Sequence, residues 1–531
     1  MRNAVTPFVL VSLAALTACN QTEPAKSSAA PTAAAAKAAT PKSCDELTAL
    51  ALPNTTISGV ETVAAGAFKS PAPAFGGPGA DFSKLPAFCR VMGSIKPSAD
   101  SDIRFEVWLP AEGWNGKFMQ TGNGGAAGSI VYGSLAEPLA RGYAVANTDT
   151  GHQGGGGDFT WANGHPEKLT DYQYRAVHEL TVVGKAVTSA RFGKSPVKAY
   201  WVGCSTGGRQ GLKEAQKYPN DYDAIVAGAP ASNWSPLMAL SISIQRNMTG
   251  PDGLAAGKLD VLTAAALAAC DARDGVTDRV IGAPKMCTFD PASTQCAARK
   301  TERCLTPTEV AAAKRIYAGV VKKDGTVLMP GTGPASEALW AAYASPQFSI
   351  GTSYFRNVVA NDPTWDPATF DADADVARAE AQDAGAARAM DPDLSAFFAH
   401  GGRLITYHGT ADGLISYGNS VNYFESVVAK LGADAVKDHA ALYLVPGMSH
   451  CQGGEGASAI DWIGALEEFD RTGKTPSSLL ATHPAQQPGP PGAPSTQGKA
   501  FTRPVCPFPQ LARYKGQGDE ADAASWECAA E

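Results

Sequence analysis

The sequence lacks a basic stripe that could follow a phosphate backbone. Its 531 residues contain 44 Lys and Arg against 51 Asp and Glu, and the net charge is −7. Nucleic acid is therefore not expected as a partner. Histidine is scarce, with eight residues, so few side chains are available as a general base. Hydrophobic residues make up 44% of the chain, and its 55 Gly and 37 Pro indicate a globular protein with many loops.

The N-terminus lacks an apolar run long enough to span a bilayer. Arg2 precedes the run Phe8–Leu16, which is too short for a membrane span and predicts a signal peptide over residues 1–19. Its last four residues, Leu-Thr-Ala-Cys, resemble a bacterial lipobox, in which Cys19 carries lipid. The alternative is an ordinary cleaved signal with an incidental Cys. We expect export in a Gram-negative bacterium, as an outer-membrane lipoprotein or as a periplasmic or extracellular protein, with membrane contact only through the lipid anchor.

Residues 20–43 have little that could form a core. They are rich in Ala, Pro, Lys, Ser and Thr, which predicts a flexible linker. Beyond Cys19 the chain has an even number of cysteines, and in an exported protein this predicts disulfides, although spacing alone does not set their pairing. The ten positions are Cys44, Cys89, Cys204, Cys270, Cys287, Cys296, Cys304, Cys451, Cys506 and Cys528.

The segment around Ser205 has the pattern of a nucleophile elbow. Lys198–Val202 reads as a short strand, a glycine-rich turn follows, and Arg209–Lys217 contains helix-forming residues. Gly203 and Gly207 flank Ser205 with the G-x-S-x-G spacing, which lets the backbone pass close beneath a nucleophile held in a strained conformation. The sequence therefore predicts Ser205 as the nucleophile of an acyl-transfer enzyme.

Two later strands supply a base and an acid. The apolar run Ala441–Val445 leads into a glycine-containing loop that carries His450. The run Arg403–Tyr407 leads into a loop that carries Asp412, 38 residues earlier. This chain order of Ser, acid and His is the one found in α/β-hydrolases, where the acid fixes the imidazole tautomer. His483 lies in a Pro-rich stretch that we expect at the surface, so it is not a candidate for the base.

The cysteines support the same assignment. Cys204 immediately precedes Ser205, and Cys451 immediately follows His450. If the hydroxyl and the imidazole touch, these two neighbours lie close enough to bridge. Such a disulfide would hold nucleophile and base in position before substrate arrives.

These residues resemble the tannase and feruloyl esterase family, whose mark is a disulfide joining the neighbours of Ser and His. The similarity extends from about Cys44 to Cys528, through the segments GCSTGGRQG, YDAIVAGAPA, CDARDGVTD, YFRNVVANDPTWD, HGTADGLIS and PGMSHC in the family's order. The resemblance implies an α/β fold of the α/β-hydrolase type. It also implies five disulfides: Cys44–Cys89, Cys204–Cys451, Cys270–Cys287, Cys296–Cys304 and Cys506–Cys528.

Three carboxylates follow Cys270 within eight residues: Asp271, Asp274 and Asp278. The spacing does not match an EF-hand, and from the residues alone either a calcium site or a solvated acidic turn is possible. The resemblance implies a structural Ca²⁺ held by these three side chains together with the carbonyls of Val276 and Val280.

The spacing between elbow and acid indicates a large insertion. About 200 residues separate Ser205 from Asp412, far more than adjacent strands need. We expect a lid domain over 236–395 that contains the calcium site, inserted into a catalytic domain made of 44–235 and 396–531.

Backbone donors for an oxyanion are expected on two loops. One is the N–H of Thr206, directly after the nucleophile, and the other is the N–H of Gly125 or its neighbour Gly124 in an early glycine-rich loop. His408 could line the substrate pocket or merely cap its strand. Ile415 would give the pocket an aliphatic wall.

The insertion offers groups that could contact an aromatic acid. Arg356 could anchor a substrate carboxylate, although a structural ion pair is the favoured interpretation. The aromatic residues could face the active site or form the core of the lid: Trp340, Tyr343, Phe348, Tyr354, Phe355 and Trp365.

The expected activity is that of a serine carboxylic-ester hydrolase acting on small esters of aromatic or phenolic acids, of the feruloyl esterase or tannase type. The alternative substrate is mono(2-hydroxyethyl) terephthalate, which the aliphatic Ile415 mildly disfavours. The triad would also serve a peptidase or a thioesterase, and a non-catalytic surface binding protein is the alternative outside enzymes. A monomer is expected.

Overall fold

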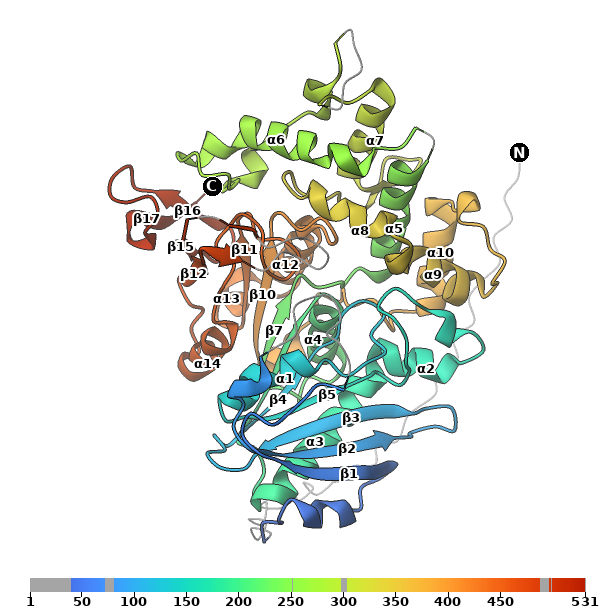
Figure 1. Cartoon of the computed structure of the whole chain (residues 1–531), viewed down its shortest axis with the longest axis vertical. Helices are drawn as coiled ribbons and strands as arrows, with labels where there is room; N and C mark the ends of the chain where they lie inside the picture. Colours follow the sequence, from blue (N-terminus) through green and yellow to red (C-terminus); the bar gives the residue numbers. More distant parts are fainter. Residues whose placement is uncertain are drawn as a thin grey trace, which may run out of the picture. The chain divides into compact units, whose positions relative to one another are not determined.

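A nine-stranded sheet organises the part of the chain that the structure describes (Figure 1). The structure is a computed structural model that describes residues 40–71, 81–250, 252–297, 303–487, 496–497 and 499–530. The predicted signal peptide, Cys19 and most of the predicted linker lie outside these residues. The strands of the sheet are, in spatial order, β1 (Thr55–Val63), β2 (Phe88–Ile95), β3 (Ile103–Pro110), β5 (Ala144–Thr148), β4 (Lys117–Thr121), β6 (Lys198–Cys204), β7 (Ala224–Gly228), β10 (Arg403–Gly409) and β11 (Ala440–Val445).

The sheet is mixed. β1, β2 and β3 pair antiparallel, and β3 pairs antiparallel with β5. From β5 through β4, β6, β7 and β10 to β11 all pairings are parallel. In a parallel sheet the carboxyl ends of the strands meet at one edge, and loops there can converge on one site. The elbow after β6 and the loops after β10 and β11 all leave from this edge.

Helices cover both faces of the parallel strands. The helices of the described chain are α1 (Tyr132–Ala140), α2 (Pro166–Thr170), α3 (Ala176–Phe192), α4 (Thr206–Lys217), α5 (Trp234–Thr249), α6 (Leu259–Cys270), α7 (Pro307–Ala318), α8 (Trp340–Ala344), α9 (Ile350–Tyr354), α10 (Ala372–Asp383), α11 (Ser395–Ala399), α12 (Tyr417–Leu431), α13 (Ala433–Lys437) and α14 (Trp462–Thr472). None of them combines the length and the apolar character that a bilayer crossing requires.

Alternation along the strands explains the two layers. In β6 the side chain of Trp201 packs in the core with α3 and α4, whereas that of Tyr200 packs in the core with α14. In β7, Ile225 packs in the same core as Trp201, and Val226 packs in the same core as Tyr200. Strands buried on both faces need continuous apolar runs, which is why these segments stand out in the sequence.

The segment between β7 and β10 contributes no described strand to this sheet. It contains α5 to α11 and one short antiparallel pair, β8 (Val320–Val321) and β9 (Val327–Met329). Most of its helices share a separate core around Trp234 and Trp340. In Figure 1 this segment, green to yellow-orange, gathers beyond the end of β7. Its division from the rest as a lid domain over 236–395 stays a prediction.

The C-terminal part forms three small antiparallel pairs: β12 (Leu479–His483) with β15 (Phe501–Val505), β13 (Gln486–Gln487) with β14 (Thr496–Gln497), and β16 (Gln510–Tyr514) with β17 (Trp526–Ala530). The expected surface position of His483 is wrong. Its side chain is buried at the end of β12 and stacks on Phe501, with ring centroids 4.8 Å apart. The Pro-rich residues that suggested a surface loop come after the strand.

Candidate active site

Ser205 stands at a sharp turn between β6 and α4. Its backbone has φ 64° and ψ −121°, a left-handed conformation that a non-glycine residue rarely adopts. The turn is held because the Ser205 N–H donates to the Gly228 carbonyl at 2.9 Å, and the Ser205 carbonyl accepts from the N–H groups of Arg209 and Ala231. Strain of this kind persists only where the surroundings fix it. The G-x-S-x-G segment is therefore a true strand–turn–helix elbow.

The flanking glycines are required by close backbone contacts. A Cβ on Gly203 would lie 2.6 Å from the Gly207 carbonyl oxygen, and a Cβ on Gly207 would lie 3.0 Å from Cα of Gly122. Any side chain at Gly203 would push the start of α4 away from its strand. α4 begins at Thr206, so its N-terminal N–H groups surround the Ser205 position.

His450 and Asp412 form a buried pair. The Nδ1 of His450 lies 2.7 Å from Oδ2 of Asp412. Oδ1 of the same carboxylate accepts the N–H groups of Leu414 and Ile415, at 2.9 and 3.0 Å. Asp412 has no exposed surface, whereas the His450 ring keeps a small exposed fraction, 9%. A ring fixed through Nδ1 leaves Nε2 available to accept a proton.

His408 also contacts this carboxylate, a contact that the sequence did not indicate. Its Nε2 lies 3.3 Å from Oδ2 of Asp412 and 3.0 Å from the carbonyl of Ile415, and its Nδ1 lies 2.8 Å from the Ser420 hydroxyl. Burial alone would raise the pKa of Asp412. The two imidazoles outweigh burial and hold that pKa well below its usual range. The fully buried ring of His408 favours a structural role over the lining of a pocket.

All five disulfides implied by the resemblance are present, with the same partners. Cys204 and Cys451 are joined with their Cα atoms 6.0 Å apart, across 247 residues of sequence. Because Ser205 and His450 are the chain neighbours of this bridge, the bridge fixes both backbones in one corner of the sheet edge. Five bridges also indicate that the folded chain resides in an oxidising environment outside the cytoplasm.

The two segments expected to supply oxyanion donors touch each other. The Thr206 hydroxyl donates to the Gly125 carbonyl at 2.6 Å. Gly125 has φ 53°, and a Cβ there would lie 2.3 Å from the Gly156 carbonyl oxygen, so this position requires glycine. A Cβ on Gly124 would meet no atom within 4 Å. The glycine-rich loop is thus anchored directly on the residue after the elbow.

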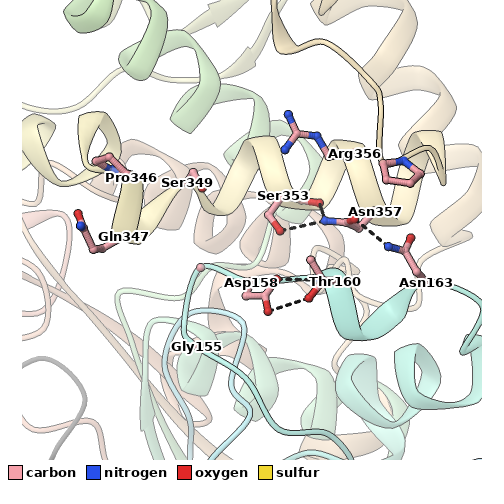
Figure 2. A pocket seen from close by; sticks show the side chains of 12 residues that line it. Gly155, Asp158, Thr160, Asn163, Pro346, Gln347, Ser349, Ser353, Arg356 and Asn357 are labelled. Carbon is pink, nitrogen blue, oxygen red and sulfur yellow. Dashed lines mark hydrogen bonds between the residues drawn. The ribbon is translucent and has the colours of Figure 1, made fainter.

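A polar cleft of about 490 Å³ opens beside this loop (Figure 2). Loop residues from Gly155 to Asn163 form one wall, and the helical segment from Pro346 to Asn357 forms the other. The walls are linked where the Phe159 N–H donates to the Ser353 hydroxyl at 2.8 Å. Gly156 in turn accepts the Ala126 N–H at 2.7 Å, which ties the cleft to the oxyanion loop.

Arg356 lines this cleft without forming the expected ion pair. Its Nε donates to the Trp365 carbonyl at 3.2 Å, and no salt bridge to a carboxylate of the described residues accompanies this hydrogen bond. Four of the six insertion aromatics are buried in the core of that segment, whereas Phe348 and Trp365 are partly exposed. Ile415 is buried in the same core. Most of the insertion's aromatic surface is therefore used for packing.

The three carboxylates expected to hold calcium lie in one loop, but each has other partners. Asp271 accepts the backbone N–H groups of Asp278 and Arg279, at 3.2 and 2.9 Å. Asp278 forms an ion pair with Arg503 at 2.5 Å. Burial raises the pKa of Asp274 to about 6, and the neighbouring Asp278 and Asp271 add to the rise. Val276 and Val280 are buried beside them.

The oxygens of these three side chains do not all lie within 4.8 Å of one another. In the described part of the chain, that spacing is met by one group of His, Cys, Asp or Glu side chains, namely His178, Glu214 and Asp221. An ion bound in the 271–280 loop would therefore require these side chains to move closer together.

Comparisons with known proteins agree with this architecture. The model of the family described as "Tannase and feruloyl esterase" matches residues 89–529. An uncharacterized esterase of Xanthomonas campestris pv. campestris is 35% identical, over 91% of each chain. A probable feruloyl esterase B-2 of Aspergillus terreus is 34% identical over 83% of this chain and 86% of its own. The crystal structure of feruloyl esterase B from Aspergillus oryzae superposes with a TM-score of 0.83, at 29% identity over 92% of this chain and 99% of that one.

Proposed function

Because this chain belongs to the tannase and feruloyl esterase family and is a carboxylic ester hydrolase, we propose that it cleaves esters of aromatic or phenolic acids through a Ser205–His450–Asp412 triad. The observation that carries the proposal is the buried His450–Asp412 pair beside a strained Ser205, with the Cys204–Cys451 bridge joining the two. The family membership removes the non-catalytic binding protein from consideration.

The reaction would proceed in two acyl-transfer steps. Nε2 of His450 takes the Ser205 proton as the hydroxyl oxygen attacks the ester carbonyl, and the imidazolium returns that proton to the departing alcohol. Water then attacks the acyl-Ser205 ester by the same route and releases the acid. Asp412 holds the ring in the tautomer that accepts a proton at Nε2. His408 acts as a positioning residue, because its Nε2 lies 3.3 Å from Oδ2 of Asp412.

The oxyanion formed in each step would be bound by backbone N–H groups. The N–H of Thr206 is the first of α4, and the N–H of Gly125 comes from the loop that accepts the Thr206 hydroxyl. Such donors, fixed before the reaction, stabilise the tetrahedral intermediate by about 3–4 kcal/mol each in comparable enzymes.

A structural Ca²⁺ is proposed for the loop that carries Asp271, Asp274 and Asp278. The donor set suits the ion, because it consists of carboxylates and the carbonyls of Val276 and Val280, with no sulfur or nitrogen ligand. Of the three carboxylates only Asp278 has an ion-pair partner among the described residues, Arg503, so a cation could neutralise the other two. Its role would be to stabilise a loop that contacts the segment carrying His450, since Val280 packs against Gly447 and Arg279 pairs with Glu455 at 3.3 Å.

Two further proposals concern the whole protein. The five disulfides support export, and we propose that the route is the lipoprotein signal ending at Cys19, which lies outside the described residues. We also propose that the protein acts as a monomer. Oligomeric state can be read from light scattering, and lipidation from the mass of the mature N-terminus.

The test of substrate class is a matched ester panel. Methyl ferulate, methyl gallate and mono(2-hydroxyethyl) terephthalate would be compared by kcat/KM with an aliphatic methyl ester of similar size. We expect the phenolic esters to lead, and Ser205→Ala to abolish all turnover while retaining the wild-type melting temperature. A preference for the aliphatic ester would contradict the substrate class, and full activity of Ser205→Ala would contradict the mechanism.

A further inference from the structure

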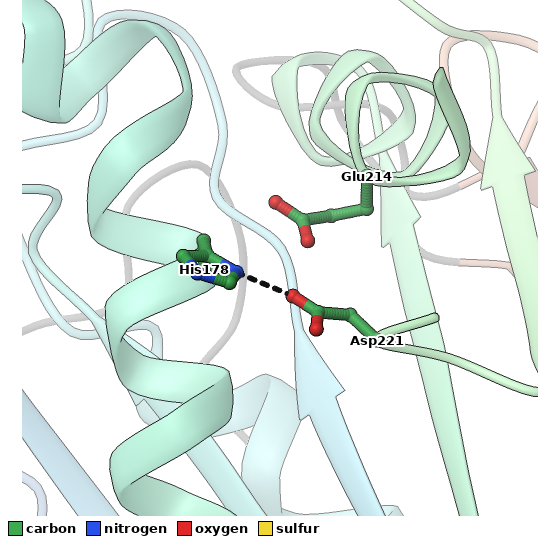
Figure 3. Close-up of side chains that lie close together, drawn as sticks. All are labelled: His178, Glu214 and Asp221. Carbon is green, nitrogen blue, oxygen red and sulfur yellow. Dashed lines mark hydrogen bonds and ion pairs between the residues drawn. The ribbon is translucent and has the colours of Figure 1, made fainter. Parts of the chain in front are cut away.

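A second polar cluster lies away from the triad, between α3 and the end of α4. His178 comes from α3, Glu214 from α4, and Asp221 from the turn before β7. One ligand-type atom of each side chain lies within 4.8 Å of the other two. Figure 3 shows the three side chains converging on one point, with Nδ1 of His178 and Oδ2 of Asp221 2.6 Å apart.

Glu214 is the unusual member of this cluster. Its side chain is 1% exposed, and neither carboxylate oxygen has a hydrogen-bond partner that meets normal geometry among the described residues. Burial raises its pKa well above the usual range, and the nearby Asp221 adds to the rise. A buried carboxylate without a donor is costly, so a group in this position calls for a compensating partner.

Among the described residues no cation forms a salt bridge or hydrogen bond with Glu214. The positive charge of Lys185 acts to lower the pKa of Glu214, but its Nζ donates to the backbone carbonyl of Asp221 rather than to a carboxylate. The ring of Tyr218 stacks on His178, with centroids 3.8 Å apart and planes at 7°, which holds the imidazole facing the two acids. The His178 side chain is 29% exposed, so an ion could reach the cluster from solvent.

We propose that His178, Glu214 and Asp221 form a binding site for a divalent transition-metal ion, with Zn²⁺ as the best match. One imidazole and two carboxylates suit zinc, whereas calcium prefers oxygen ligands alone. Zinc binds nitrogen and oxygen at about 2.0–2.2 Å, so three ligand atoms around one ion lie about 3–4 Å apart. The ion would take the place of the proton between His178 and Asp221, whose facing atoms are 2.6 Å apart and would separate by about 0.5–1 Å to reach that spacing. Water would complete the coordination.

The site would fasten α3 to α4, the helix that starts directly after Ser205. This site shares no residue with the 271–280 loop. It also differs in its ligands, because it includes an imidazole and that loop does not. The proposal does not depend on the esterase mechanism, so its test can be run in the Ser205→Ala protein as well as in the wild type.

The experiment is zinc binding to the full chain, stripped with chelator and kept in excess Ca²⁺, followed by calorimetry and by thermal melting. We expect one Zn²⁺ per chain, a rise in melting temperature with zinc, and X-ray absorption that shows a single imidazole ligand. His178→Ala and Glu214→Gln should each weaken binding by more than about 100-fold, beyond the about 10–100-fold that a change outside the coordination sphere costs. The matched control is His165→Ala, since His165 pairs with Asp100 at 2.8 Å but belongs to no three-ligand cluster among the described residues.

Two results would overturn the proposal. One is zinc binding that is equal in wild type, His178→Ala and His165→Ala. The other is an absence of zinc binding to the wild type; a Glu214→Gln protein as stable as the wild type or more so would then assign Glu214 a buried proton instead of an ion. Failure of the esterase assay would affect neither result, because metal binding is read independently of turnover.

Discussion

Replacing Asp412 by Asn tests the role of the acid more sharply than removing it. Oδ1 of Asp412 accepts two backbone N–H groups, from Leu414 and Ile415. An amide nitrogen at that position would face two donors, so the Asn side chain must keep its oxygen there. Its NH₂ group is therefore forced into the Oδ2 position, 2.7 Å from Nδ1 of His450.

This orientation has a direct chemical consequence. The NH₂ group donates to Nδ1 of His450, so the ring proton moves to Nε2, and Nε2 can no longer accept the proton of Ser205. In a serine protease triad the same substitution lowers kcat by about 10⁴ through the wrong tautomer. A loss of that size corresponds to about 5 kcal/mol of barrier height. We expect a similar loss in kcat here with little change in KM, since Asp412 is buried and does not touch substrate.

The assay is steady-state hydrolysis of a phenolic methyl ester across pH, with near-ultraviolet circular dichroism as the control for folding. The oxygen and nitrogen of Asn can be assigned from a high-resolution structure through their partners. If a folded Asp412→Asn protein kept more than about a tenth of the wild-type kcat, which corresponds to a barrier change under about 1.4 kcal/mol, the acid would lie elsewhere and the argument would fail.

Two other perturbations test the disulfides and the calcium loop. Replacing Cys204 and Cys451 by Ser opens a loop of 247 residues, for which loop entropy gives a destabilisation of about 5 kcal/mol, against about 3 kcal/mol for the 22-residue separation of Cys506 and Cys528. Urea midpoints under non-reducing conditions should therefore fall more for the Cys204/Cys451 replacement than for the Cys506/Cys528 replacement. Only the Cys204/Cys451 replacement should also lower kcat; equal kcat losses would refute the positioning role of that disulfide. Removing Ca²⁺ with chelator should lower the melting temperature, and Asp274→Asn should remove this sensitivity; a melting temperature indifferent to chelator and to added Ca²⁺ would contradict the calcium site.

The parallel strands and the elbow could be predicted because their signals are local. A strand buried on both faces must be apolar throughout, so Lys198–Val202, Arg403–Tyr407 and Ala441–Val445 were visible as runs, and β6, β10 and β11 contain them. The glycines of the elbow could also be predicted, because the turn requires close backbone contacts two residues before and two residues after Ser205. The disulfide partners other than Cys204–Cys451 needed the family resemblance, because spacing does not define pairing.

What could not be predicted depends on contacts between distant segments. The ring of His408 reaches Asp412 only because β10 ends in a turn that brings residues four apart together. The neighbours of Glu214 come from two helices and a turn. Helical spacing predicts which face of its helix Glu214 occupies, but it does not predict which residues of other segments lie against that face. His483 was misplaced because the Pro-rich composition that follows it outweighed the short strand that contains it.

The central claim is that Ser205 carries the acyl group. The most direct measurement is labelling of the folded protein with a serine-directed phosphonate, followed by peptide mass mapping. The account predicts one phosphonate per chain, on the peptide that contains Ser205, with activity lost in proportion to labelling and no label on Ser205→Ala. Label at another serine, or full labelling of Ser205 without loss of ester hydrolysis, would contradict it.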